Sequence, residues 1–231
     1  MTLHIGIVAC SAEGAALCYR TICTEGARLL GPHGHPEVSM HTHSLSEYVQ
    51  RLEKGDAQGV AELVLSSARK LTAIGADFLI CPDNTIHSAF EHVEAESPKP
   101  WLHIAKVVAD EARARGFKRL GITGTTWLVD SDVYPQVLRE CGLEFARPER
   151  DDRDEIGRII MDELVCGLFK PKSIAYLQGV IERFKSSGCD AVVLGCTEIP
   201  LVVNDTNSTL PTLDSTRLLA RAALRHAVHV N

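Results

Sequence analysis

A cysteine follows an apolar run near the end of the chain. Cys196 stands in the segment Gly-Cys-Thr-Glu, directly after the buried-strand pattern of residues 191–194. Gly195 permits a tight turn, and Thr197 adds a hydroxyl. A helix starting just beyond would offer free N–H groups that favour a thiolate or a bound carboxylate. A lone thiol can equally be a small buried hydrophobe. The setting makes Cys196 the first candidate for proton transfer.

A second polar cluster occurs 113 residues earlier. Asp83-Asn84-Thr85 follows the apolar run of residues 78–81, as Cys196-Thr197-Glu198 follows residues 191–194. The two segments align as GADFLICPDNTIH (75–87) and GCDAVVLGCTEIP (188–200). The strand-like IGI at 5–7 and LGI at 120–122 repeat at nearly the same offset. This internal repeat predicts two α/β halves of similar topology.

The repeat has a chemical consequence. In open parallel sheets, ligands bind beyond the carboxyl ends of the strands, where both clusters are expected. If the halves face each other about a pseudo-twofold axis, Asp83 and Cys196 occupy equivalent positions on opposite walls of one cleft. A planar carbon between them has one group on each face. That arrangement suits removal of a proton from one side and its return to the other.

The remaining pattern supplies the elements that would position these groups. Apolar runs predict strands, and periodic segments closed by Gly31 and Gly75 predict helices. The alternation implies a mainly parallel sheet with helices on both faces. Strands are expected at 3–9, 38–43, 78–81, 119–123 and 191–194, and helices at 12–30, 57–74, 101–115, 129–141, 152–166, 173–187 and 213–228.

Length and composition exclude several classes of protein. The 231 residues are long enough for one large domain or two small ones. A net charge of −6 without a basic run argues against nucleic acid as a partner, and no apolar run approaches the length of a membrane span. No signal peptide is visible, and the eight cysteines show no CxxC or zinc spacing. We expect reduced thiols in a cytoplasmic protein.

Other residues are candidates for binding. Side-chain amide and hydroxyl groups suit a substrate carboxylate, whereas Glu198 suits an ammonium group. The alternative for several of them is helix capping or turn formation. The expected substrate-binding residues are Ser11, Asn84, Thr85, Thr197, Glu198 and Lys170.

Metal and cofactor sites find little support. His33, His35, His41 and His43 form two His-x-His pairs, but no acidic or thiol partner occurs at ligand spacing. Neither a dinucleotide-binding nor a P-loop motif is present. We therefore expect no metal and no cofactor.

The two repeated clusters resemble a known family. ICPDNTIH at 80–87 and VLGCTEIP at 193–200 are similar to the paired signatures of the aspartate/glutamate racemase family, and DELVCG at 162–167 and LDST at 213–216 are weaker similarities. The resemblance implies a cofactor-independent racemase of two pseudo-symmetric α/β domains, usually a homodimer. It places the second family cysteine at Cys196. It also implies a matching lysine near Lys170.

The position of the first family cysteine is Asp83 in this chain. Some L-specific members also lack a cysteine there. A free Asp has a pKa of about 3.9 and a free Cys of about 8.5, so this pair starts as carboxylate and thiol. Two-way transfer needs a protonated Asp83, which burial or a nearby substrate carboxylate would favour. Cys81, two residues earlier, is an alternative base or a buried strand residue.

These observations lead to one expected function and two alternatives. We expect an N-terminal half over 1–100, joined by a C-terminal helix within 210–231, and a second half over 101–209, with the active site between them. The expected reaction is proton transfer at the α-carbon of aspartate or glutamate, with Cys196 and Asp83 as the catalytic pair. A one-cysteine decarboxylase or isomerase, and a non-catalytic amino-acid-binding protein, are the alternatives.

Overall fold

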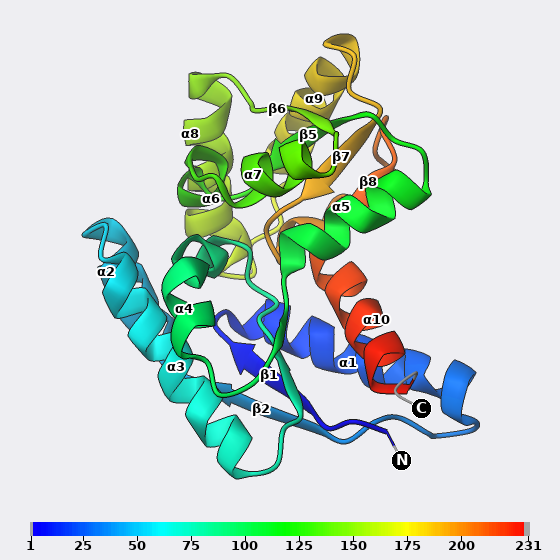
Figure 1. Cartoon of the computed structure of the whole chain (residues 1–231). Helices are drawn as coiled ribbons and strands as arrows, with labels where there is room; N and C mark the ends of the chain where they lie inside the picture. Colours follow the sequence, from blue (N-terminus) through cyan, green and yellow to red (C-terminus); the bar gives the residue numbers. More distant parts are fainter. Residues whose placement is uncertain (1, 229–231) are drawn as a thin grey trace. The chain divides into compact units, whose positions relative to one another are not determined.

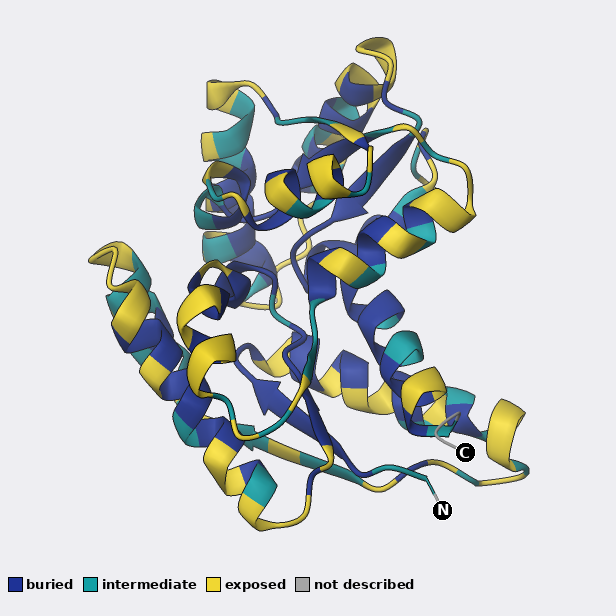
Figure 2. Ribbon diagram, in the orientation of Figure 1, coloured by how far each residue is buried: buried dark blue, intermediate teal, exposed yellow. Residues whose placement is uncertain are grey.

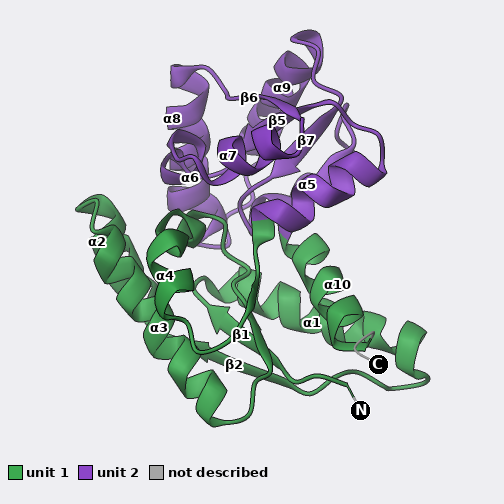
Figure 3. Cartoon of the chain, in the orientation of Figure 1, with its two compact units in different colours: residues 1–104, 216–231 green, residues 105–215 purple. Residues whose placement is uncertain are grey.

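The computed structural model describes residues 2–228. The expected N-terminal half included residue 1 and the expected C-terminal segment included residues 229–231, and these lie outside the described residues. The chain forms two compact units (Figure 3). Unit 1 comprises residues 1–104 and 216–231, and unit 2 comprises residues 105–215. The chain therefore leaves unit 1 once, at Ile104, and returns to it at Thr216.

Unit 1 is built on a four-stranded parallel sheet of order β2-β1-β3-β4. Its strands β1 and β2 are labelled in Figure 1. Its central strands β1 and β3 are completely buried, as the near-continuous apolar sequences of parallel strands require. The strands are β1 (Ile5–Ala9), β2 (Val38–Thr42), β3 (Phe78–Ile80) and β4 (Trp101–Leu102). The helices are α1 (Ala12–Leu30), α2 (Leu45–Glu53), α3 (Ala57–Ala73), the 3₁₀ turn η1 (Thr85–Ala89), α4 (Phe90–Glu96) and α10 (Ser215–Val228), whose first residue belongs to unit 2.

Unit 2 has a second four-stranded parallel sheet, of order β6-β5-β7-β8. The strands are β5 (Arg119–Thr123), β6 (Glu144–Ala146), β7 (Ala191–Leu194) and β8 (Thr212–Asp214). The helices are α5 (Ile104–Ala114), whose first residue belongs to unit 1, α6 (Thr126–Asp130), α7 (Val133–Glu140), α8 (Arg150–Ile159), the π-helical turn η2 (Ile160–Leu164), α9 (Pro171–Ser186) and the 3₁₀ turn η3 (Ile199–Leu201).

Both sheets share one topology: the second strand of each unit lies outermost, followed by the first, the third and the fourth. The expected α/β class with parallel sheets is confirmed. The repeated segments occupy equivalent strands, since residues 78–80 form β3 and residues 191–194 form β7, the third strand of each unit.

The repeated Gly-x-Asp has the same structural role in both units. Gly75 and Gly188 end their helices with φ of 99° and 87°, a left-handed conformation that favours glycine. Asp77 accepts a hydrogen bond from the backbone N–H of His4, at 2.8 Å. Asp190 accepts from the N–H of Arg119, at 3.1 Å. Each carboxylate thus ties the start of the third strand to the start of the first.

The structure differs from the predicted elements mainly at the edges of the sheets. Strands β4, β6 and β8 have only two or three residues, too few to show a period. Helices α2 and α4 were also not predicted. The helix expected over 101–115 begins only at Ile104, and the one expected over 129–141 is divided at Ser131 into α6 and α7.

The buried residues follow the central strands and the inner faces of the helices (Figure 2). In unit 1 the core packs α3 against β1 and β3, with Val64, Leu71 and Leu79 fully buried. In unit 2 it joins α8, η2 and α9 to β7, and it includes Cys196. Among the residues described, no helix has the length and apolar character needed to cross a bilayer.

Candidate active site

The first part of the candidate site lies at the carboxyl edge of the unit 1 sheet. Strands β1 and β3 are parallel neighbours, so the residues that follow them meet at one edge. Ser11 follows β1 and caps α1, where its Oγ accepts from the N–H of Gly14 at 3.3 Å. Asp83 follows β3 and is half-buried, whereas Asn84 and Thr85 are buried.

Hydrogen bonds hold the Asp83 loop in place. The Asp83 carboxylate accepts from the backbone N–H of Ile86 through Oδ1, at 3.3 Å. The Asp83 backbone carbonyl accepts from Nδ1 of His87 at 2.8 Å, and from the Cys81 thiol at 3.9 Å. The loop conformation is therefore specified by residues on both sides of Asp83.

Cys81 has the surroundings of an unreactive thiol. Its side chain is fully buried, and burial, with the Asp83 carboxylate nearby, raises the pKa of the thiol well above its usual value. Its S–H is directed at a carbonyl oxygen. A thiol that stays protonated at neutral pH is a poor base, which argues against Cys81 as the alternative to Asp83.

The second part of the candidate site lies at the carboxyl edge of the unit 2 sheet. The backbone N–H of Gly195 donates to the carbonyl of Thr123 at 3.0 Å, directly after β7. A β-carbon at Gly195 would lie 2.4 Å from that carbonyl oxygen. Only glycine allows this close approach, which places Cys196 immediately beyond the strand.

Cys196 and Thr197 share one carboxylate oxygen. The Cys196 thiol donates to Oε2 of Glu198 at 2.9 Å, and the Thr197 hydroxyl donates to the same oxygen at 2.7 Å. All three side chains are buried. The thiol therefore has an acceptor for its proton inside its own loop. The sequence interpretation assigned Glu198 to a substrate ammonium group and missed this contact, although the Cys-x-Glu spacing was visible.

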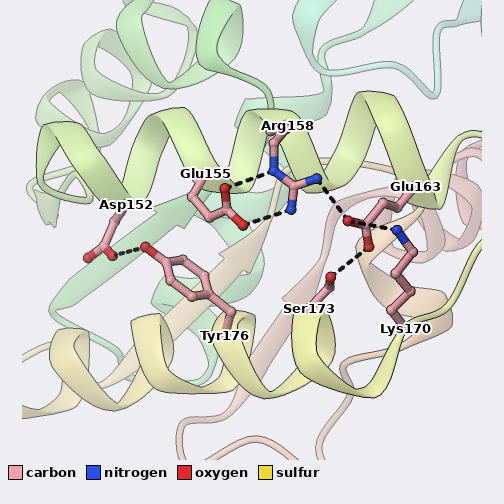
Figure 4. A network of polar contacts seen from close by, with 7 residues as sticks. All are labelled: Asp152, Glu155, Arg158, Glu163, Lys170, Ser173 and Tyr176. Carbon is pink, nitrogen blue, oxygen red and sulfur yellow. Dashed lines mark hydrogen bonds and ion pairs between the residues drawn. The ribbon is translucent and has the colours of Figure 1, made fainter.

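Lys170 takes part in an ion-pair network at the start of α9 (Figure 4). Its Nζ lies 3.4 Å from Oε1 of Glu163, a buried residue in the π-helical turn η2. Ser173 donates to Glu163 at 2.6 Å, and Arg158 donates at 2.8 Å. These hydrogen bonds, led by the one from Ser173 and helped by Lys170, lower the pKa of Glu163 to about 2. Lys170, although exposed, thus faces a carboxylate that is ionised at neutral pH.

Both histidines of the pair His41 and His43 have hydrogen-bond partners in unit 1. Nδ1 of His41 lies 2.9 Å from the Ser67 hydroxyl, and Lys70 donates to its Nε2 at 3.0 Å. His43 contacts Ser66 at 3.1 Å. Within residues 2–228, no three side chains of the types that ligate metals come together.

Apart from Lys170, which lies at the start of α9 beside Glu163, the predicted site residues fall into two groups. Ser11, Asp83, Asn84 and Thr85 gather at the carboxyl edge of the unit 1 sheet. Cys196, Thr197 and Glu198 gather at the corresponding edge in unit 2. Cys196 belongs to the same core cluster as Leu164, the residue that follows Glu163 in the sequence. His87 was missed by the sequence interpretation, although its position four residues after Asp83 was a usable signal.

One protein sequence and two solved structures that are similar to this chain are described as racemases or racemase homologues. The broad-specificity amino-acid racemase RacX of Bacillus subtilis is 23% identical over 172 residues, which cover 73% of each chain. A candidate Asp/Glu racemase from Yersinia pestis has a similar structure, with a TM-score of 0.90 and 29% identity, over 98% of this chain and 100% of that one. An aspartate racemase homologue from Pyrococcus horikoshii has a TM-score of 0.83 and 27% identity, over 98% and 99% of the two chains.

The family comparison covers nearly the whole chain. The Asp/Glu/hydantoin racemase family matches residues 7–223. This range includes both repeated loops and, apart from the start of β1, every strand that the described residues form. The resemblance seen in those loops is therefore confirmed across the fold that carries them. This chain belongs to the Asp/Glu/hydantoin racemase family.

Proposed function

We propose that this protein is a cofactor-independent amino-acid racemase that acts on aspartate- or glutamate-type substrates. The proton at Cα moves between Cys196 and Asp83. One observation carries the proposal: the loops after β3 and β7, equivalent strands of two like sheets, bear a carboxyl group at one position and a thiol at the other. Membership of the racemase family supports the reaction class.

The proposed reaction uses Asp83 and Cys196 in turn as base and acid. In one direction the Asp83 carboxylate removes the Cα proton while the Cys196 thiol supplies a proton to the opposite face. In the other direction the Cys196 thiolate removes the proton and the protonated Asp83 supplies one. The planar carbanion between these steps gains from hydrogen bonds to its carboxylate, for which Ser11, Asn84 and Thr85 are the proposed donors.

The contact between Cys196 and Glu198 gives the thiol a place for its proton. When the thiol must act as a base, transfer of its proton to the Glu198 carboxylate leaves a thiolate, and Thr197 keeps a hydrogen bond to the same carboxyl group. A base held at hydrogen-bond distance is the geometry that activates a thiol. Glu198 therefore serves Cys196 in this proposal, and Lys170 and Thr197 remain the proposed unit 2 contacts of the substrate.

The proposal extends to a cytoplasmic homodimer with a small amino-acid or dicarboxylate substrate. The family resemblance supports the dimer.

A second candidate function rests on the same thiol contact. Because Glu198 lies within unit 2, Cys196 can give or take a proton without Asp83. One-sided protonation of a carbanion, as in a decarboxylase or an isomerase of unsaturated diacids, needs no more than that. Amino-acid binding without catalysis is the remaining alternative.

One experiment separates these functions. The protein is incubated with L- and D-aspartate and with L- and D-glutamate in deuterated water, and both Cα exchange and the opposite enantiomer are measured. Racemisation gives deuterium in both enantiomers. Exchange in one enantiomer alone indicates a one-sided site, and binding without exchange contradicts catalysis on these substrates.

Variants then test the two groups. Cys196→Ser is expected to abolish exchange. Asp83→Asn is expected to abolish inversion but to leave exchange on the Cys196 side. Asp83→Cys adds a thiol to that of Cys196, and it is expected to show the inversion that Asp83→Asn lacks. Full racemisation by Asp83→Asn would contradict the proposed role of Asp83.

A further inference from the structure

His87 is buried beside the Asp83 loop and has a partner for each ring nitrogen. Nδ1 lies 2.8 Å from the backbone carbonyl oxygen of Asp83. Nε2 lies 3.3 Å from the backbone nitrogen of Ile104. The side chain is only 3% exposed, so these two groups rather than water satisfy the ring.

The two partners specify one protonation state of His87. A carbonyl oxygen only accepts, so Nδ1 must carry the hydrogen. A backbone N–H only donates, so Nε2 must be bare. In an imidazolium both ring nitrogens carry hydrogen, so the Nε2–H would point at the Ile104 N–H and two donors would face each other. Burial, together with His103 nearby, accordingly lowers the pKa of His87 well below its usual value. The ring is therefore a neutral bridge with a fixed donor and a fixed acceptor.

Aromatic neighbours hold this ring in its plane. Phe90 stacks on His87, with ring centroids 4.1 Å apart and 17° between the planes. His103 meets it edge-on at 4.6 Å. These contacts pack the ring in the orientation that directs its Nδ1–H at the Asp83 carbonyl.

Ile104, which donates to Nε2 of His87, lies where a helix begins and where the chain leaves unit 1. Ile104 is the first residue of α5, where a helix has N–H groups that lack helical acceptors. It is also the last residue of unit 1 before the chain passes into unit 2. His87 thus joins the Asp83 loop to the point where the chain leaves the unit.

We propose that His87 is a positioning residue for Asp83: by bridging the Asp83 carbonyl and the Ile104 N–H, it sets the orientation of the Asp83–Asn84 peptide and so of the Asp83 carboxyl group. The inference rests on the proposed racemase function. It adds a residue that does not touch the substrate and acts through the backbone of one that does.

Three variants separate the two hydrogen bonds. The amide of His87→Asn reaches the place of Nδ1 and keeps the donor to Asp83. The amide of His87→Gln reaches the place of Nε2 and keeps the acceptor for Ile104. His87→Leu removes both. Trp101→Phe is the matched control, because Trp101 belongs to the same aromatic cluster but meets Phe90, 5.2 Å away, rather than His87.

The readout is Cα exchange from each enantiomer in deuterated water, with kcat and KM for inversion. His87→Leu and His87→Gln are expected to lower kcat for inversion about 10-fold or more, with little change in KM. This decrease approaches the rate factor that one positioned acid–base group contributes. Exchange from the enantiomer served by Asp83 should fall in parallel, while exchange on the Cys196 side persists. His87→Asn should recover most of the inversion rate, and Trp101→Phe should retain it.

Two results would overturn the inference. Equal loss of exchange from both enantiomers, in proportion to lost thermal stability, would indicate a structural role alone. Retained inversion in His87→Leu would show that Asp83 needs no such support. A measurement independent of activity keeps the inference distinct from the proposed function: ¹⁵N NMR of the wild-type protein at pH 7 should show hydrogen on Nδ1 and none on Nε2, and the opposite tautomer would refute the bridge.

Discussion

The thiol of Cys196 and the carboxylate of Glu198 are joined by a hydrogen bond of 2.9 Å between Sγ and Oε2. Both side chains are buried, and they stand two residues apart in the loop after β7. A cysteine with a carboxylate at this distance has a built-in acceptor for its proton.

Glu198→Gln tests whether this carboxylate serves the thiol or the substrate. The amide keeps the size of the side chain but cannot take the thiol proton. We expect kcat to fall by ~10²-fold or more with little change in KM, in the range of one lost acid–base group. Steady-state racemisation, followed by circular dichroism, measures both constants. Glu182→Gln, an exposed position on α9, is the control. A rise in KM at unchanged kcat would instead assign Glu198 to the substrate ammonium group.

Glu163 should make the protein sensitive to acid. Its pKa is lowered from 4.5 to about 2, so the folded protein holds the ionised form more tightly than the unfolded chain does. The stability contributed is complete above pH 4.5 and is lost as the pH falls towards 2. Thermal unfolding between pH 7 and pH 3 should show a steeper loss for the wild type than for Glu163→Gln, which starts lower at pH 7.

Glu155→Gln is the matched control for that experiment. Glu155 also pairs with Arg158, at 2.7 Å, but its side chain is partly exposed. Exposed pairs contribute little, so this variant should unfold close to the wild type at pH 7. An equal loss in the two variants would show that the burial of Glu163 is irrelevant.

His87 should make the free energy of unfolding depend on pH in a higher range than Glu163 does. Its folded-state pKa lies well below the ordinary 6.5, so the unfolded chain binds a proton that the folded protein excludes. Stability is therefore complete above about pH 6.5 and falls as the pH drops below it. The free energy of unfolding, measured with urea between pH 7.5 and 5.5, should fall more for the wild type than for His87→Asn. Parallel curves would contradict a neutral buried ring.

Glycine substitutions test the packing beneath the unit 2 loop. A β-carbon at Gly121, in the middle of β5, would lie 2.5 Å from the ring of Phe184. Gly121→Ala should destabilise the protein by ~1–3 kcal/mol through overpacking. At Gly179, inside α9, the nearest atom to an added carbon is the flexible Arg183 side chain at 3.6 Å. Gly179→Ala should stabilise it by ~0.5–1 kcal/mol, because the unfolded chain loses freedom. Chemical denaturation of both variants gives the comparison.

The sequence alone determined the parallel α/β architecture and the two polar loops. These features are local: apolar runs mark the central strands, and Gly-x-Asp marks the return of the chain from each helix to the third strand. The repeat of Gly75–His87 in Gly188–Pro200 carried the equivalence of Asp83 and Cys196, and the same segments carried the resemblance to the racemase family. The short edge strands escaped because two or three residues show no period.

The tertiary structure decided which partner each polar side chain takes. Glu198 turns back to Cys196, His87 reaches Ile104 at a separation of 17 residues, and Glu163 gathers Ser173 and Lys170. None of these contacts follows from residue type, because a carboxylate or an imidazole has several partners of similar strength within reach. The folded backbone selects among them by fixing distance and direction, and burial makes the selected hydrogen bond the only way to satisfy the group.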